Sequence, residues 1–260
     1  MKELAAELLA AYSNGTTLSA QLSARPNFDM AAAYALEAEF VRLRQETGRT
    51  TVGLKVGYAN KAMWRALKLE TLVWAHMYDD TVHYTDDNYA RLSLDRMVAP
   101  KIEPEIVFRM KTPLNSSTDP AAILETVEWL APGFEIIDCP FPNWKFQPTD
   151  FVATFGLHRG LIVGKPLRVT PDLISSLAAQ LPVFTLRLSK NGQIVEEGSG
   201  KNSLRSPALC LGELARGIHL SPGDLVSSGT LTTPTLIARG EEWKVEVAGL
   251  DLQGLTAIFE

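Results

Sequence analysis

Three glutamates in two apolar segments have the residue types and the spacing of a metal site. Glu103 and Glu105 lie in residues 101–108, and alternate residues of a strand face the same side, so an extended chain places both carboxylates on one face. Neighbouring carboxylates repel each other, so they either face water or share a cation. Glu135 stands alone in a second apolar segment, residues 134–137. Three carboxylates on adjacent strands suit Mg²⁺ or Mn²⁺.

The same glutamates also allow a simpler interpretation, in which they lie on a solvated face of a sheet. Glutamate is mostly exposed in folded proteins. The position of Glu135 within an apolar run favours the metal site somewhat. The spacing alone leaves both interpretations open.

Lys55 and His76 are the candidate groups for moving protons. Lys55 lies between Gly53 and Gly57, and without further information a surface lysine is the simpler interpretation. In a partly desolvated pocket beside a cation, its pKa is expected to fall, which would make the neutral amine accessible. His76 follows Trp74 and either assists in the site or packs beside that ring, and histidine titrates near neutrality.

The N-terminal part of the chain has helical patterning. Apolar positions recur at helical spacing over residues 30–45, with Asp29 as a predicted N-cap and Gly48 near the end. Residues 51–57 are predicted to form a strand. Asn60 is expected to cap a short helix that ends at Leu67.

The rest of the chain indicates short strands separated by turns. Residues 101–110 predict a strand, where Pro104 favours an edge or a bulge. Asp119 and Pro120 predict a helix that runs to Leu130. Asn191-Gly192 predicts a tight hairpin, and Ser206-Pro207 begins a helix that reaches residue 216. Further strands are expected at residues 134–138, 161–164, 224–228, 235–238, 243–247 and 252–259.

Composition excludes several classes of partner. The chain has 260 residues, a net charge of −5 and no basic run, so nucleic acid and anionic membranes are poor partners. No apolar stretch is long enough to span a bilayer. Cys139 and Cys210 lack metal-type spacing and are expected to be buried thiols rather than a disulfide. These features predict a cytoplasmic protein.

Four segments in order resemble one known family. They are Gly53-Leu54-Lys55-Val56-Gly57, the Glu-x-Glu strand of residues 101–108, Phe134-Glu135-Ile136-Ile137-Asp138, and Gly223-Asp224-Leu225-Val226-Ser227-Ser228-Gly229. Together they resemble the 2-keto-4-pentenoate hydratase / 4-oxalocrotonate decarboxylase branch of the fumarylacetoacetate hydrolase superfamily. The resemblance implies an α+β fold, a mixed, mostly β sandwich roll with an N-terminal helical region. We expect that region at residues 1–70 and a β-rich catalytic core at residues 71–260, working as one unit.

The resemblance also implies a site. Glu103, Glu105 and Glu135 would hold Mg²⁺ or Mn²⁺, and Lys55 would lie beside the substrate. The loop Ser228-Gly229-Thr230 would contact the substrate carboxylate.

The resemblance gives weaker support for substrate contacts at several other positions. Lys145, in the loop after the strand that carries Glu135, either meets the far end of the substrate or is an exposed surface lysine. Asn202 or Ser203 is a further candidate contact, whereas His83, His158 and His219 show no ligand-type spacing and receive no role. The resemblance implies a homo-oligomer.

One position departs from the family pattern. Hydratases of this branch carry an aspartate in an Ala-Asp-Met segment, and the segment here is Ala75-His76-Met77. This argues against hydration of a dienoate specifically and leaves decarboxylation, carbon–carbon bond hydrolysis or keto–enol isomerisation open. The first hypothesis is a metal-dependent lyase, a hydratase or decarboxylase of a small 2-oxo or 2-hydroxydienoic acid, as in aromatic-compound catabolism. The second is a hydrolase of an acylpyruvate-type bond with water activated by His76, and the third is a non-catalytic 2-oxo acid binding protein.

Overall fold

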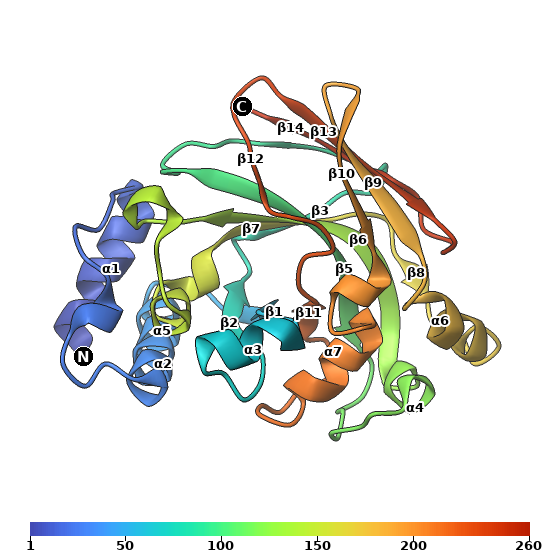
Figure 1. Cartoon of the computed structure of the whole chain (residues 1–260), viewed down its shortest axis with the longest axis horizontal. Coiled ribbons are helices and arrows are strands. Elements are labelled where there is room, and N and C mark those ends of the chain that lie inside the picture. Colours follow the sequence, from blue (N-terminus) through green and yellow to red (C-terminus); the bar gives the residue numbers. More distant parts are fainter.

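Two β-sheets form the centre of the molecule, and the smaller sheet lies over the larger one (Figure 1). The computed structural model describes residues 1–260. The larger sheet runs in the order β2-β1-β11-β5-β6-β7-β3, with β12 pairing β5 and β8 pairing β6. Its strands are β1 (Thr51–Gly57), β2 (Val73–Tyr78), β3 (Val82–Tyr84), β5 (Pro100–Met110), β6 (Val127–Asp138), β7 (His158–Val163), β8 (Leu167–Arg168), β11 (Leu225–Ser227) and β12 (Thr235–Leu236).

The smaller sheet has the order β10-β9-β13-β14-β4. Its strands are β4 (Tyr89–Leu92), β9 (Thr185–Lys190), β10 (Gln193–Ser199), β13 (Glu242–Ala248) and β14 (Leu255–Phe259). The hairpin between β9 and β10 turns at Asn191 and Gly192, both with positive φ, as the sequence predicted. The main hydrophobic core includes Ile102 and Phe134 of the larger sheet and Trp243 and Phe259 of the smaller one, so it joins the two sheets.

Helices cover the larger sheet on two sides and from below (Figure 1). On one side lie α1 (Lys2–Asn14), α2 (Met30–Glu46) and α5 (Pro148–Val152), and on the other lie α4 (Pro120–Leu124) and α6 (Ile174–Gln180). Below the sheets are α3 (Lys61–Leu67) and α7 (Pro207–Leu214). Four 3₁₀ turns, η1 (Leu22–Ala24), η2 (Pro142–Trp144), η3 (Phe155–Leu157) and η4 (Gly200–Asn202), connect these elements. No helix combines the length and the apolar character that a membrane crossing requires.

The predicted mixed, mostly β fold with N-terminal helices is confirmed, and two helix starts follow the predicted chemistry. The Asp29 carboxylate accepts a hydrogen bond from the Ala32 N–H at 2.9 Å, which caps α2. The Asn60 side chain accepts from the Ala62 N–H at 3.0 Å and caps α3. The helices α5 and α6 were not predicted.

Two local predictions are wrong. The helix that begins at Pro120 ends at Leu124, because residues from Val127 onward join β6 and pair along β5. Pro104 lies in the middle of β5 rather than at an edge. The Pro104 carbonyl accepts from the Leu231 N–H, which lies in the connection between β11 and β12. The proline nitrogen is on the same side of β5, where no strand pairs with it, so the absence of an N–H costs no ladder hydrogen bond.

The helical region and the β-rich core share the larger sheet. β1 precedes the expected boundary at residue 70, yet it pairs with β2 on one side and with β11 on the other. A second hydrophobic core under α1 and α2 includes Leu8, Leu36 and Phe40. The helices therefore pack directly on the elements that hold β1 in place.

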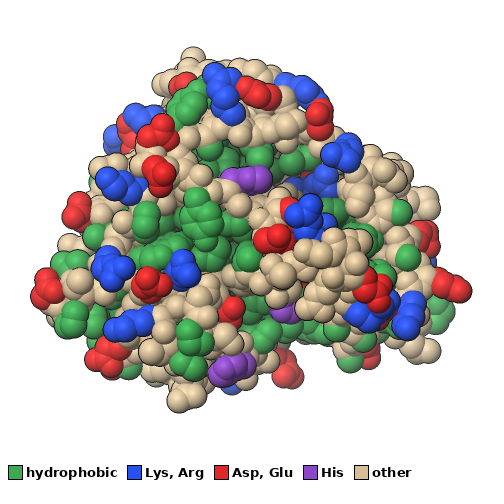
Figure 2. All heavy atoms as spheres, turned by 180° about the vertical axis from the view of Figure 1, so that it is seen from behind, with side chains coloured by type: hydrophobic (Ala, Val, Ile, Leu, Met, Phe, Trp, Pro, Cys, Tyr) green, Lys and Arg blue, Asp and Glu red, His purple; other side chains and the backbone are tan.

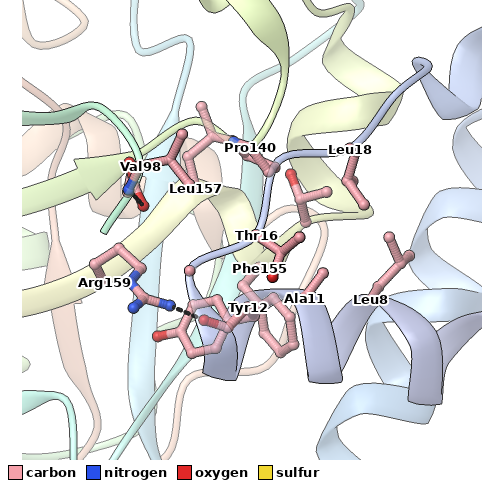
Figure 3. Close-up of a pocket in the computed structure, with 13 residues that line it drawn as sticks. Leu8, Ala11, Tyr12, Thr16, Leu18, Val98, Pro140, Phe155, Leu157 and Arg159 are labelled. Atoms are coloured by element: carbon pink, nitrogen blue, oxygen red, sulfur yellow. Dashed lines mark hydrogen bonds between the residues drawn. The ribbon is translucent and has the colours of Figure 1, made fainter. Parts of the chain in front are cut away.

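A small cavity of about 30 Å³ lies where α1 meets the start of β7 (Figure 3). The Arg159 guanidinium donates to the Tyr12 carbonyl at 2.6 Å and lies 4.1 Å above the centre of the Tyr12 ring. Most of the wall is apolar, with Leu8, Ala11 and Phe155 labelled in Figure 3. This contact fastens α1 to β7 of the larger sheet.

Candidate active site

The three predicted metal-binding glutamates converge. Glu103 and Glu105 project from β5, and Glu135 on β6 is the direct cross-strand partner of Glu103. One oxygen from each of the three carboxylates lies within 4.8 Å of the others. The residues expose only 8%, 3% and 0% of their surface, respectively. The interpretation as a solvated face is therefore wrong.

Two of these buried oxygens lack any hydrogen-bond partner. They are Oε1 of Glu105 and Oε2 of Glu135. The other oxygen of Glu105 accepts from the Ser227 hydroxyl and, at 2.9 Å, from the Gly229 N–H. Because an unpaired buried acceptor is costly, two unpartnered oxygens in a cluster of three neighbouring carboxylates fit a hard divalent cation.

The carboxylates strongly perturb one another. Burial raises the pKa of Glu103 to about 7, and the negative charge of Glu135 adds to this effect while Lys55 opposes it. Burial and the charges of Glu135 and Glu103 hold the pKa of Glu105 well above its usual value. Burial alone would raise the pKa of Glu135. Lys55 and His158 lower it by more than burial raises it, so the net pKa of Glu135 is below its ordinary value.

Lys55 lies beside the triad, as predicted. Its ammonium group donates to the Gly156 carbonyl at 2.9 Å and lies 3.1 Å from Oε1 of Glu135. It also lies 4.7 Å from the centre of the Phe151 ring. Burial lowers the pKa of Lys55, yet the nearby carboxylates, Glu135 first, raise it more, so the net pKa is above the ordinary value. The carboxylates thus outweigh burial among the protein groups, while the predicted lowering of the Lys55 pKa beside a bound cation stays a prediction.

His158 is a site residue that sequence reasoning missed. Its Nδ1 lies 2.9 Å from Oε1 of Glu135, and its Nε2 lies 2.9 Å from the Thr81 hydroxyl oxygen. The residue begins β7, which pairs with β6, and it is almost fully buried. A histidine at the start of an apolar strand was the available signal, although ligand-type spacing was absent.

His76 lies outside the site, which corrects its predicted catalytic role. In the antiparallel ladder Ala75 is opposite Lys55, whereas His76 is opposite Leu54, so the His76 side chain points to the other face of the sheet. There its Nδ1 lies 2.7 Å from Oε1 of Glu37 on α2. Strand alternation therefore separates the histidine from the lysine.

The predicted substrate loop is only partly available to a ligand. Gly229 and Thr230 line the cavity described below. The Ser228 hydroxyl is instead buried and donates to the Ile106 carbonyl at 2.8 Å, so its predicted contact with substrate is wrong. The Gly229 N–H is directed at Glu105.

Lys145 is exposed and is absent from the wall of the cavity, which corrects its predicted contact with substrate. Its neighbours Trp144 and Phe146 line the wall instead. Another lysine, Lys101, lines the cavity. Of the two further candidates, Asn202 lines the cavity and Ser203 is buried behind it.

A cavity of about 640 Å³ connects the triad to the surface, a volume that suits a small molecule. Lys55 and Glu103 lie at its base. Aromatic side chains form much of one wall, and the loop after β11 forms another. The lining includes Tyr58, Met63, Lys101, Ile137, Trp144, Phe146, Phe151, Glu196, Glu197, Asn202, Gly229, Thr230 and Thr232.

Curated relatives have the chemistry that this geometry suggests. The chain is 28% identical over 231 residues to a 4-oxalocrotonate decarboxylase from Pseudomonas sp. (strain CF600), covering 86% of this chain and 84% of the relative. It is 26% identical over 249 residues to a 2-hydroxyhexa-2,4-dienoate hydratase from Comamonas testosteroni, covering 94% and 92%. The predicted hydratase and decarboxylase branch is thereby confirmed.

A solved structure shares the whole fold. The 4-oxalocrotonate decarboxylase from Pseudomonas putida G7, complexed with magnesium and adipate, matches with a TM-score of 0.88 and 25% identity. The match covers 100% of this chain and 97% of that one. The family model of the fumarylacetoacetate (FAA) hydrolase C-terminal domain matches residues 52–256. This protein therefore belongs to the fumarylacetoacetate hydrolase family.

Proposed function

We propose that this protein is a divalent-metal-dependent lyase, a hydratase or decarboxylase of a small 2-oxo or 2-hydroxydienoic acid. The observation that carries the proposal is the buried triad Glu103, Glu105 and Glu135, with two unpartnered oxygens beside Lys55 at the base of a cavity. Relatives named as decarboxylases and dienoate hydratases support the reaction class. The magnesium-bound decarboxylase supports Mg²⁺, with Mn²⁺ as the alternative ion.

The residues of the chain supply binding and proton handling. Mg²⁺ held by the three glutamates would polarise the 2-oxo group of a substrate and offset the charge of the carboxylates. Lys55 holds a proton at Nζ, fixed by Gly156 and Glu135, beside the point where the carboxylates converge. The ring of Phe151 shields this ammonium from water. Thr230 lies on the wall where it would contact the substrate carboxylate.

The test is to neutralise the ligands one at a time. Glu103→Gln and Glu105→Gln should reduce turnover of 2-hydroxydienoates and 4-oxalocrotonate by at least about 100-fold, since each removes a ligand of the cation. The free energy of unfolding should remain high, and Mg²⁺ affinity by calorimetry should fall in parallel with turnover. Glu242→Gln, an exposed glutamate on β13, is the matched control. Unchanged Mg²⁺ affinity in the double variant would refute the site.

Analysis of the reaction products distinguishes the lyase from the two other hypotheses, a hydrolase and a non-catalytic binding protein. Hydrolysis with water activated by His76 loses its structural basis, because His76 lies on the other face of the sheet and is bonded to Glu37. In ¹⁸O-water, label in a released carboxylic acid would nevertheless support hydrolysis, and CO₂ release supports decarboxylation. A binding protein without catalysis predicts thermal stabilisation by Mg²⁺ and oxalate together with no turnover of any 2-oxo acid.

The proposal includes a homo-oligomer in the cytoplasm. Ile194 of β10 and Leu236 of β12 each expose 57% of their surface, and Val195 exposes 40%. Hydrophobic side chains also gather near the hollowed centre of the face in Figure 2. Such apolar surface favours self-association, which light scattering after size exclusion would detect. The two buried cysteines are both free, in keeping with a reducing compartment.

A further inference from the structure

The cavity contains a second lysine that the proposed reaction does not use. Lys101 precedes Glu103 by two residues on β5, so both side chains project from the same face of the strand, and both line the cavity. Lys101 lies opposite Ile137, and Glu103 lies opposite Glu135. The floor of the cavity therefore runs along two paired strands from the triad to Lys101.

The ammonium group of Lys101 has no carboxylate within the 4.0 Å of an ion pair. It lies instead 4.1 Å from the centre of the Trp144 ring, which lines the same wall. Stacking on an aromatic ring fixes the position of an ammonium while leaving its N–H donors free to bind an anion. Lys101 is thus a positioned cation that faces the cavity.

Another part of the cavity wall is acidic. Glu196 and Glu197 line it from β10, and only Glu197 has a cationic partner, Arg187. A ligand carboxylate is therefore repelled from the β10 side. It finds positive charge on the β5 side, at Lys101.

We propose that Lys101 binds a second carboxylate at the far end of the substrate, so that the site selects 2-oxo dicarboxylic acids over monocarboxylic ones. This rests on the proposed function, in which the 2-oxo acid end of the substrate lies at the triad. Two residues along a strand span about 6.6 Å. With carbon–carbon bonds of about 1.5 Å, that distance fits an extended chain of about five to seven carbons.

The experiment compares two probes of equal length, 2-oxoadipate and 2-oxohexanoate, which differ by one carboxylate. Binding of each to the full chain with millimolar Mg²⁺ is measured by calorimetry. The wild type should bind 2-oxoadipate more tightly. Lys101→Met should weaken 2-oxoadipate binding by about 10- to 100-fold, the loss of one charge-assisted hydrogen bond, and weaken 2-oxohexanoate binding by less than about threefold. Lys101→Arg should keep most of the preference.

Lys145→Met is the matched control, because it removes the same charge from a neighbouring exposed residue outside the cavity. An equal loss in this control would assign the preference to general positive charge and overturn the role of Lys101. Equal weakening of both probes by Lys101→Met, or a wild type without preference, would also overturn it and leave the lyase proposal standing. Failure of the wild type to bind either probe with Mg²⁺ would refute both proposals.

Discussion

Each carboxylate of the triad has a different environment, although all three are glutamates. Glu105 is held by Ser227 and Gly229, Glu135 by Lys55 and His158, and Glu103 by no hydrogen bond of its own. The held residues each keep one oxygen free. The protein therefore fixes the directions of two ligands and leaves the third to adjust.

The raised pKa of Glu103 makes metal binding depend on pH. A carboxyl whose folded-state pKa exceeds its unfolded value binds more protons when folded, so its contribution to stability is present at low pH and is lost as pH rises. For Glu103 this window runs from 4.5 to about 7. Mg²⁺ requires ionised ligands, so it should stabilise the fold progressively more across this window.

We therefore expect Mg²⁺ to raise the melting temperature more at about pH 8 than at about pH 5, since protons compete with the cation at the lower pH. Differential scanning calorimetry with and without Mg²⁺ measures both increments. Glu105→Gln should abolish the increment at the higher pH. Equal increments at the two pH values would show that no carboxylate with a raised pKa binds the ion.

His158 should act by positioning Glu135 rather than by contact with substrate. Substituting His158→Phe removes both of its polar contacts, and loss of a group that orients a metal ligand lowers metal affinity by about 10- to 100-fold. Calorimetry with Mg²⁺ checks the affinity, and His158→Gln should recover part of it. The exposed His219→Gln is the control. Full metal affinity in His158→Phe would contradict this role.

At the scale of elements, short turns between the strands orient the site side chains that project from the strands. The 3₁₀ turn η3 (Phe155–Leu157) directs the Gly156 carbonyl at Lys55, and Gly156 has a φ of +60°. A Cβ at Gly156 would lie 2.7 Å from Cδ of Lys55 and 2.9 Å from Cβ of Ala75. The turn therefore binds the lysine through its carbonyl and leaves no room for a side chain at this position.

Gly156→Ala should displace the Lys55 ammonium and lower kcat by about 100-fold, the scale expected for a misplacement of about 1 Å in an active site. Steady-state kinetics and thermal unfolding measure the two effects separately. Gly240→Ala is matched in backbone, because Gly240 has a φ of +79° but open space around it. It should lose stability without losing turnover. Equal kinetics in the two variants would exclude steric positioning by η3.

The sequence predicted those parts of the site that depend on local sequence and missed those that depend on tertiary packing. The acidic triad and Lys55 were predicted because strand alternation and the order of motifs lie in the local sequence. His76 and Lys145 were misplaced because the local sequence does not show which way either side chain points. Strand pairing decides this for His76, which lies opposite Leu54 rather than Lys55. Lys101 and His158 were missed because their partners Trp144 and Glu135 are distant in sequence.

At the scale of the whole molecule, the N-terminal helices support the site from behind. Phe40 of α2 stacks on Phe155 of η3 with ring centres 4.1 Å apart, and both rings are buried. Phe155 precedes Gly156, the residue that binds Lys55. The fold class and most strands were predictable from the sequence, but this support depends on how α2 packs.

Phe40→Ala should lower the free energy of unfolding by about 3–5 kcal/mol, the usual result of removing a buried ring. Chemical denaturation followed by circular dichroism measures the change. Val183→Ala, at a residue with 69% of its surface exposed, should change the free energy by less than about 0.5 kcal/mol. A loss below about 1 kcal/mol in Phe40→Ala would mean that α2 contributes little to the core.

β11 pairs with both β1 and β5, so the larger sheet around the metal site is complete only when this late segment of the chain has folded. Glu105 receives its hydrogen bonds from residues 122 and 124 positions later in the chain. During synthesis, this carboxylate lacks these hydrogen-bond donors until nearly the entire polypeptide has left the ribosome. We therefore expect the ion to bind only late in synthesis, and a chain truncated before β11 would leave Glu105 without these two hydrogen bonds.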